Sequence, residues 1–181
     1  MVSESKGKKM MKAVVNRFLV LHDNPSLIEE RLISEQDITT KFVLPMLSAL
    51  NWDKYHIDTR KGPEVREKAY RVKDNVKKGL PDIMLSSDHG DVFVEVKRPP
   101  LCSQGLPNLS RYGDANLIIL TSFEQTAFYC CPDKKRKPVL RKEWGFKEYV
   151  TDFHSLWRIL SNTEEGRQVR AAYKATRELI R

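Results

Sequence analysis

The sequence has no long apolar run, and this absence excludes several classes of protein. In 181 residues no apolar stretch approaches the ~18–20 residues that cross a bilayer. The N-terminal "MVSESKGKKMMKAVV" contains lysines but neither a continuous apolar segment nor a small-residue cleavage site. We therefore expect no signal peptide, no membrane partner and a cytoplasmic location.

Cysteine is scarce as well. The three cysteines, Cys102, Cys130 and Cys131, form no C-x-x-C pair, and the histidines are scattered. This pattern favours reduced, buried thiols over a disulfide framework or a zinc site. The chain also lacks a G-x4-G-K-[ST] loop, so it carries no ATP-driven motor of that type.

Charge is plentiful. The composition is 40% apolar and 31% charged, which is typical of a soluble globular protein with one core. The net charge of +8 permits binding to a polyanion but does not require it.

Periodicity indicates a mixture of helices and strands. Helical spacing is found in residues 10–21, 25–33, 34–53 (with a bend or a restart at Pro45), 149–160 and 164–180. Strand-like runs occupy residues 55–59, 80–87, 91–99, 115–122 and 125–131. Residues 1–9 are expected to be a loose tail, and the basic segment 132–146 a loop.

This order predicts an α/β (α+β) protein with a central mixed four- to five-stranded sheet flanked by helices. We divide it into an N-terminal tail with helices (1–33), a core domain (34–160) and a C-terminal helix (161–181).

Two predicted strands carry charge where a core strand would be apolar. Asp82 lies near the start of one, and Glu95 and Lys97 lie at the end of the next, where these two share one face about 7 Å apart along the strand. In an antiparallel hairpin the start of one strand lies beside the end of the other, so the three side chains should meet at one rim of the sheet.

Two interpretations fit this meeting of charges. Carboxylates beside a lysine could hold Mg²⁺, with Mn²⁺ as a substitute, and so promote attack of water on a phosphodiester. Alternatively, Lys97 could simply neutralise Glu95 in a structural ion pair.

The charged residues also form a recognisable pattern: Pro81-Asp82, twelve residues, then Glu95-Val96-Lys97. This resembles the signature of the PD-(D/E)XK nuclease superfamily. The segment "SEQDITTKFVLPMLSALNWD" resembles the opening helix of the nuclease domain at the N-terminus of type I restriction enzyme R subunits, with Glu35 matching its acid and Asn51 replacing its usual glycine.

The resemblance implies a restriction-endonuclease-like fold and a set of roles. Asp82, Glu95 and the carbonyl of Val96 would bind the metal, Lys97 would activate water, and Glu35 would reach the same site. A Gln-x3-Tyr element of relatives is matched by Asn108 and Tyr112, with Gln104 as a possible substitute for the glutamine.

We therefore expect a Mg²⁺-dependent DNA endonuclease, with motor or specificity subunits of a restriction system as possible partners. The residues expected to contact DNA are Lys61, Arg66, Arg71, Lys73, Lys77, Lys78, Arg98, Gln104, Asn108 and Tyr112. The alternatives are an inactive DNA-binding or interaction module of a defence system and, third, a junction-resolving nuclease that would need a dimer.

Overall fold

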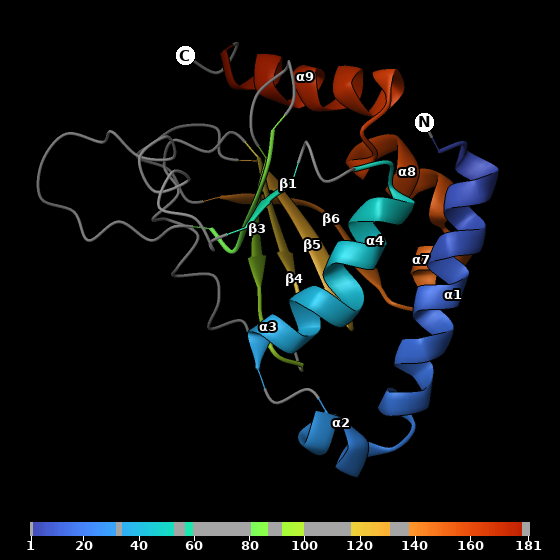
Figure 1. Ribbon diagram of the computed structural model, residues 1–181. Helices are drawn as coiled ribbons and strands as arrows, with labels where there is room; N and C mark the ends of the chain where they lie inside the picture. Colours follow the sequence, from blue (N-terminus) through green and yellow to red (C-terminus); the bar gives the residue numbers. More distant parts are fainter. Residues whose placement is uncertain are drawn as a thin grey trace, which may run out of the picture.

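A computed structural model describes residues 2–31, 34–52, 57–59, 81–86, 92–99, 117–130 and 138–178. In this part of the chain six strands form one sheet in the order β1-β2-β3-β4-β5-β6 (Figure 1). β3 and β4 pair in parallel, and the other neighbours pair antiparallel. The strands are β1 (Ile57–Thr59), β2 (Ile83–Leu85), β3 (Val92–Val96), β4 (Leu117–Thr121), β5 (Gln125–Cys130) and β6 (Val139–Gly145). The predicted mixed sheet is confirmed.

Helices flank this sheet. In Figure 1 the segment from α3 to α4 crosses in front of the sheet, α1 stands to the right of it, and α9 lies above it. The bounds are α1 (Glu4–His22), α2 (Pro25–Arg31), α3 (Glu35–Ile38), the π-helix η1 (Thr39–Val43), α4 (Leu44–Ala49), α7 (Glu148–Thr151), α8 (Phe153–Leu160) and α9 (Glu164–Glu178). No helix in the described ranges is both long and apolar enough to span a bilayer. The division into three segments at residues 33 and 160 stays a prediction.

The core lies on both faces of the sheet. A large cluster joins α1, α4 and α8 to one face, which includes Val92, Val94 and Val96 of β3. A smaller cluster on the other face contains Phe93 of the same strand. β3 is therefore buried on both faces, and its side chains alternate as the sequence predicts.

The predicted basic loop at residues 132–146 is wrong for its second half. Residues 139–145 form β6, which pairs with β5 and brings the sheet to six strands. Only Trp144 of this strand is buried, since it lies at the sheet edge. Most side chains of this edge strand are exposed, so few of its positions are apolar. Its charged residues therefore gave it the composition of a loop.

The predicted bend or restart at Pro45 is found as a restart, with Pro45 in the first turn of α4. The chain runs from α3 through the π-helix η1 into α4, which begins at Leu44. The Leu44 N–H donates to the Thr39 carbonyl, five residues back. Pro45 has no N–H to donate, so a regular α-helical ladder could not continue through it.

Asn51 ends this helical segment in a left-handed conformation with φ 66°. The Trp52 N–H donates to the Leu47 carbonyl (3.0 Å) and the Asn51 N–H to the Ser48 carbonyl (3.1 Å), which is the Schellman pattern. Glycine and asparagine both tolerate this conformation. Asn51 can therefore stand where the helix that this segment resembles usually has glycine. The Asn51 side chain also accepts from the Val2 N–H and donates to the Asn162 carbonyl, both at 2.8 Å.

The predicted loose tail at residues 1–9 is wrong from residue 4 onward. Ser3 caps α1 by accepting from the Lys6 N–H, and the helix starts at Glu4. Gly7 is buried where α1 crosses α4. The sequence did not indicate a helix here, because these first turns are polar and contact the core through Gly7, which has no side chain.

Replacing Gly7 by alanine is expected to lower the free energy of unfolding by about 1–2 kcal/mol. The new Cβ would lie 2.5 Å from the Ala49 carbonyl oxygen and 2.8 Å from the Trp157 ring. Such overpacking costs about 1–3 kcal/mol, against a gain of up to about 1 kcal/mol in helix propensity. Urea denaturation would measure the change, with the exposed Asn16→Ala on the same helix as control. Equal stability of the two variants would contradict this packing.

Candidate active site

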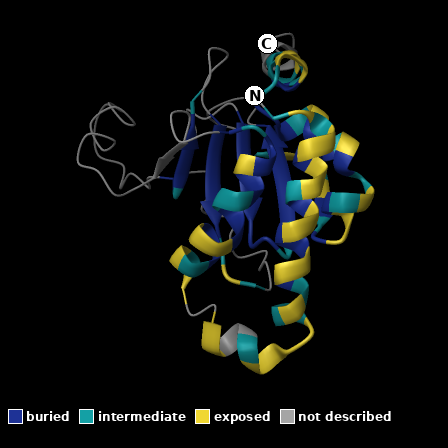
Figure 2. Cartoon of the chain, turned by 45° about the vertical axis from the view of Figure 1, so that its right-hand side comes forward, coloured by how far each residue is buried: buried dark blue, intermediate teal, exposed yellow. Residues whose placement is uncertain are grey.

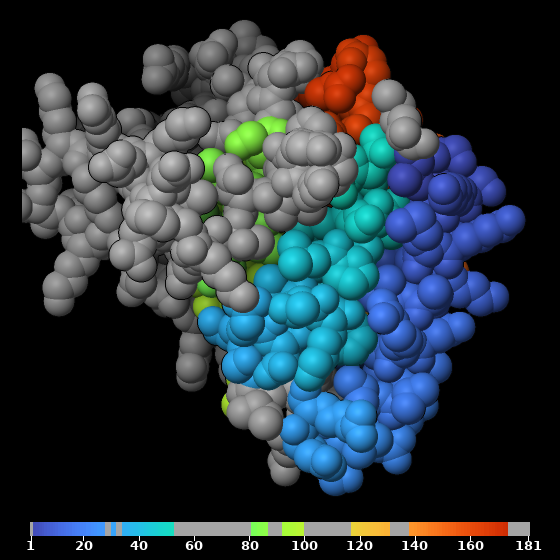
Figure 3. All heavy atoms as spheres, in the orientation of Figure 1, coloured from blue at the N-terminus to red at the C-terminus, as the bar shows by residue number. Residues whose placement is uncertain are grey.

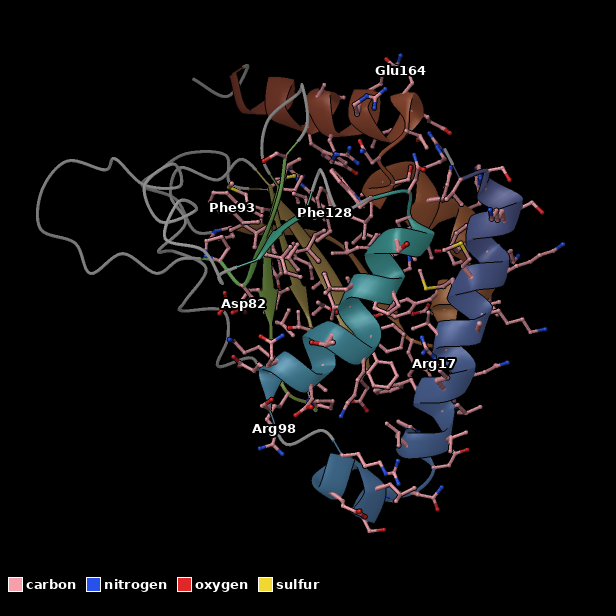
Figure 4. The ribbon with its side chains drawn as sticks, in the orientation of Figure 1. Arg17, Asp82, Phe93, Arg98, Phe128 and Glu164 are labelled. Carbon is pink, nitrogen blue, oxygen red and sulfur yellow. The ribbon has the colours of Figure 1, made fainter. Side chains whose placement is uncertain are left out.

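The β2–β3 pair brings the first two charged residues together. Ile83 pairs with Val94, and both pack in the large cluster. Asp82 and Glu95, one residue further along each strand, therefore lie opposite each other and on the other face. The Asp82 carboxylate accepts a 2.8 Å hydrogen bond from the Val96 N–H, so it lies against the end of β3 (Figure 4).

The Lys97 ammonium is the centre of the cluster. It donates to Glu95 Oε1 at 2.7 Å, to Glu35 Oε1 at 3.1 Å and to the Val96 carbonyl at 3.1 Å. The Lys97 main chain is held in turn, because its N–H donates to the Thr121 carbonyl of β4 at 2.8 Å. Five sequence-predicted residues thus share one chain of hydrogen bonds: Glu35, Asp82, Glu95, Val96 and Lys97.

Glu35 comes from a helix far away in the sequence. Ser34 and Asp37 form a reciprocal capping box at the start of α3, and this box fixes the first turn that carries Glu35. The Thr39 hydroxyl donates to the Glu35 carbonyl at 2.8 Å and holds the other end of the turn. The carboxylate of Glu35 is thereby positioned over the end of β3.

The cluster is graded in exposure, from a buried carboxylate to an accessible one. The side chain of Glu95 is 7% exposed, that of Lys97 22% and that of Glu35 44%. Solvent therefore reaches the cluster from the side of Glu35. A molecule that approached from solvent would meet Glu35 and Lys97 before Glu95.

Lys97 is held as an ammonium. Burial alone would lower its pKa, but the hydrogen bond and charge of Glu95, and then those of Glu35, outweigh burial and raise the pKa above its ordinary value. At neutral pH the side chain is therefore a cation and a hydrogen-bond donor. In this arrangement it can orient a water molecule or stabilise negative charge, but it cannot accept a proton.

The oxygen atoms of this cluster, from carboxylates and a main-chain carbonyl, are the type of ligand that a hard divalent cation prefers. Within the described ranges, no group of three or more histidine, cysteine, aspartate or glutamate side chains is arranged to hold a metal ion. Mg²⁺, however, commonly uses one or two carboxylates and completes its shell with water. Glu95, Glu35 and the Val96 carbonyl already surround one cationic group. The Asp82 carboxylate lies beside this group, on the Val96 N–H.

Most residues predicted to contact DNA lie outside the described residues. These are Lys61, Arg66, Arg71, Lys73, Lys77, Lys78, Gln104, Asn108 and Tyr112. Arg98 is described: it is exposed, directly follows Lys97 and projects near the start of α3 (Figure 4).

Sequence reasoning missed the support beneath the cluster. Thr121, whose carbonyl holds Lys97, has a buried hydroxyl that accepts from the Phe123 N–H at 3.0 Å and is hydrogen-bonded to the Thr126 hydroxyl at 2.6 Å. Phe123 has φ 64°, a costly conformation for a bulky residue, and its ring is fully buried. No local motif marks such a residue, since only the three-dimensional packing requires it.

Comparison of the chain with family models, with curated proteins and with solved structures finds no match. The family resemblance therefore stays a hypothesis, and the candidate site rests on its own geometry.

Proposed function

We propose that this protein is a metal-dependent DNA endonuclease of restriction-endonuclease-like fold, as the resemblance to the type I R-subunit nuclease domain implies. One observation supports this most strongly. Glu95, Glu35 and the Val96 carbonyl converge on a single cationic group at the end of a buried strand, with Asp82 on the adjoining amide. A cytoplasmic location and DNA as substrate belong to the same proposal.

Each residue has a role in this proposal. Glu95 and the Val96 carbonyl would ligate Mg²⁺ or Mn²⁺, with Glu35 beside them and Asp82 ligating from the adjacent strand. When bound, the ion would polarise a phosphodiester oxygen and acidify a water molecule. Lys97, kept charged by Glu95 and Glu35, would orient the attacking water and stabilise charge on the scissile phosphate.

A purely structural ion pair explains less of the arrangement. Neutralising Glu95 requires one cation, yet Lys97 is shared with Glu35 from a distant helix. Buried ion pairs are in general a weak source of stability, because desolvation offsets much of the attraction. A cluster of acids around one lysine, open to solvent on one side, is better explained by chemistry than by folding.

The proposal is tested by incubating supercoiled plasmid with the protein and Mg²⁺ or Mn²⁺, against a control in EDTA. The expected result is metal-dependent nicking or linearisation, with and without candidate motor or specificity subunits. Intact plasmid under all of these conditions would reject the endonuclease and favour the inactive binding module.

A further inference from the structure

The outer face of α1 carries a charge pattern that the candidate site does not use. Figure 2 shows that much of α1 is exposed. Its exposed cationic side chains are Lys6, Lys8, Lys9, Lys12 and Arg17, which we call the α1 basic face. Within the described part of the chain, none of them pairs with a carboxylate. The sequence has no acidic residue between positions 5 and 21, so the face is positive throughout.

This pattern opposes the stability of the helix. Lys6 and Lys9, Lys9 and Lys12, and Lys8 and Lys12 are three or four residues apart, and like charges at these spacings repel on a helix by about 0.2–0.5 kcal/mol per pair. Lys6 also lies in the first turn, where the helix dipole disfavours a cation. These lysines destabilise the helix without making a compensating contact inside the protein. Such unfavourable residues are expected on a surface that serves binding.

The buried face of α1 limits what this surface could bind. Met11, Val14, Val15 and Phe18 are all packed in the large cluster. A helix that binds a membrane surface must insert its apolar face, and here that face is already occupied. Protein interfaces are depleted in lysine and need an apolar centre, whereas Val20 is the only exposed large hydrophobic residue of the helix among the described residues. A regular polyanion fits the face better than either.

The basic face shares a side of the molecule with the segment that carries Glu35. Figure 3 shows α1 and the α3–α4 segment side by side on one surface. Beneath this surface the two regions are connected through the core: Phe18 of α1 packs on Phe123 with ring centroids 5.0 Å apart, and Phe123 lies two residues after Thr121, whose carbonyl holds Lys97. From Lys6 to Arg17 the helix extends about 16 Å, at about 1.5 Å per residue, and so could follow several phosphates of a duplex.

We propose that the α1 basic face binds the phosphate backbone of double-stranded DNA, at a contact surface separate from the cleavage site. The identity of the polyanion rests on the proposed function. The contact is sequence-independent, because lysines on a convex helix meet phosphates and not base edges in this arrangement. It holds the duplex on the side of the molecule from which Glu35 and Lys97 are accessible.

The test is a triple substitution, Lys8→Gln, Lys9→Gln and Lys12→Gln, measured by fluorescence anisotropy with a 30-base-pair duplex in EDTA. We expect the triple variant to bind the duplex at least about tenfold more weakly at 0.1 M salt. The slope of the logarithm of the binding constant against the logarithm of the salt concentration is expected to be shallower by about 2–3, since each phosphate contact contributes about 0.9 to that slope. The control triple removes the same charge elsewhere: Arg141→Gln, Lys142→Gln and Lys147→Gln. It should bind DNA much more tightly than the α1 triple.

Two outcomes would overturn the inference. One is an α1 triple that binds the duplex as tightly as the control triple, which would make net charge the cause. The other is an α1 triple that loses binding to anionic phospholipid vesicles while duplex binding is unchanged. The melting temperature should stay equal or rise, because the substitutions remove like-charge repulsion.

This experiment separates the inference from the proposed function. Binding is measured without metal, so it does not depend on cleavage. If the duplex binds through α1 but no plasmid is cut in Mg²⁺ or Mn²⁺, the surface is supported and the nuclease is rejected. If plasmid is cut while the α1 triple binds normally, the nuclease stands and the surface is rejected.

Discussion

Glu95→Gln is expected to lower the rate of Mg²⁺-dependent DNA cleavage at least about 10²-fold, while DNA binding in EDTA stays unchanged. The glutamine has the same shape but lacks the charge that faces Lys97 at 2.7 Å. It would therefore be a poorer metal ligand and a poorer partner for the ammonium. Lys97→Met is expected to lose cleavage to a similar extent, since it removes the ammonium that donates to both Glu35 and Glu95.

The matched control is Glu143→Gln, an exposed carboxylate on β6. It changes net charge equally but is expected to keep cleavage within about twofold of the natural chain. Cleavage at the natural rate in Glu95→Gln or in Lys97→Met would remove the assignment of the site, whatever the activity of the protein as a whole.

Phe18→Ala is expected to lower the free energy of unfolding by about 3–5 kcal/mol, a large part of the stability of a domain of this size. The Phe18 ring is fully buried and meets three aromatic rings edge-on, at centroid distances of 5.0–5.2 Å. The rings belong to Phe42 of η1, Phe123 after β4 and Phe146 after β6. Removing Phe18 leaves a cavity that joins all of these elements.

Chemical denaturation would measure this loss, with Val20→Ala two residues away as the control. Val20 is 61% exposed, so its truncation should change stability by no more than about 0.5 kcal/mol. A loss below about 1 kcal/mol in Phe18→Ala would show that the aromatic cluster does not hold α1 on the sheet.

The sequence alone predicts those parts of the fold in which burial imposes a period. β3 and β4 are buried along their whole length and are largely apolar in sequence, with Glu95 as the charged exception in β3. The middle of α1 can be predicted because its buried residues recur at helical spacing: Met11, Val14, Val15 and Phe18. Ser34 and Asp37 mark the start of α3 through local chemistry that needs no knowledge of the fold.

Elements that bury little, or that depend on distant contacts, could not be predicted in the same way. β6 exposes most of its residues and has a loop-like composition, so only its pairing with β5 defines it. The first turns of α1 depend on Gly7, whose missing side chain allows contact with Ala49 and Trp157. The left-handed conformation of Phe123 is imposed by its place among aromatic rings and has no sequence signal.

The candidate site, too, has residues whose meeting the sequence predicts and others whose meeting it does not. Asp82, Glu95 and Lys97 could be brought together from strand order alone, and their geometry follows the antiparallel pairing of β2 and β3. The meeting of Glu35 with Lys97 was expected only from the family resemblance, because nothing in a helix N-terminus indicates which strand end it covers. The Thr121 carbonyl was not expected, because a main-chain acceptor has no signature in a sequence.

The central claim is that these converging oxygens hold a divalent cation, and calorimetric titration with Mn²⁺ tests it most directly. We expect saturable uptake by the natural chain and by Glu143→Gln, and no uptake by Asp82→Ala or Glu95→Gln at millimolar metal. Equal uptake by all four proteins, or none by the natural chain, would contradict the account.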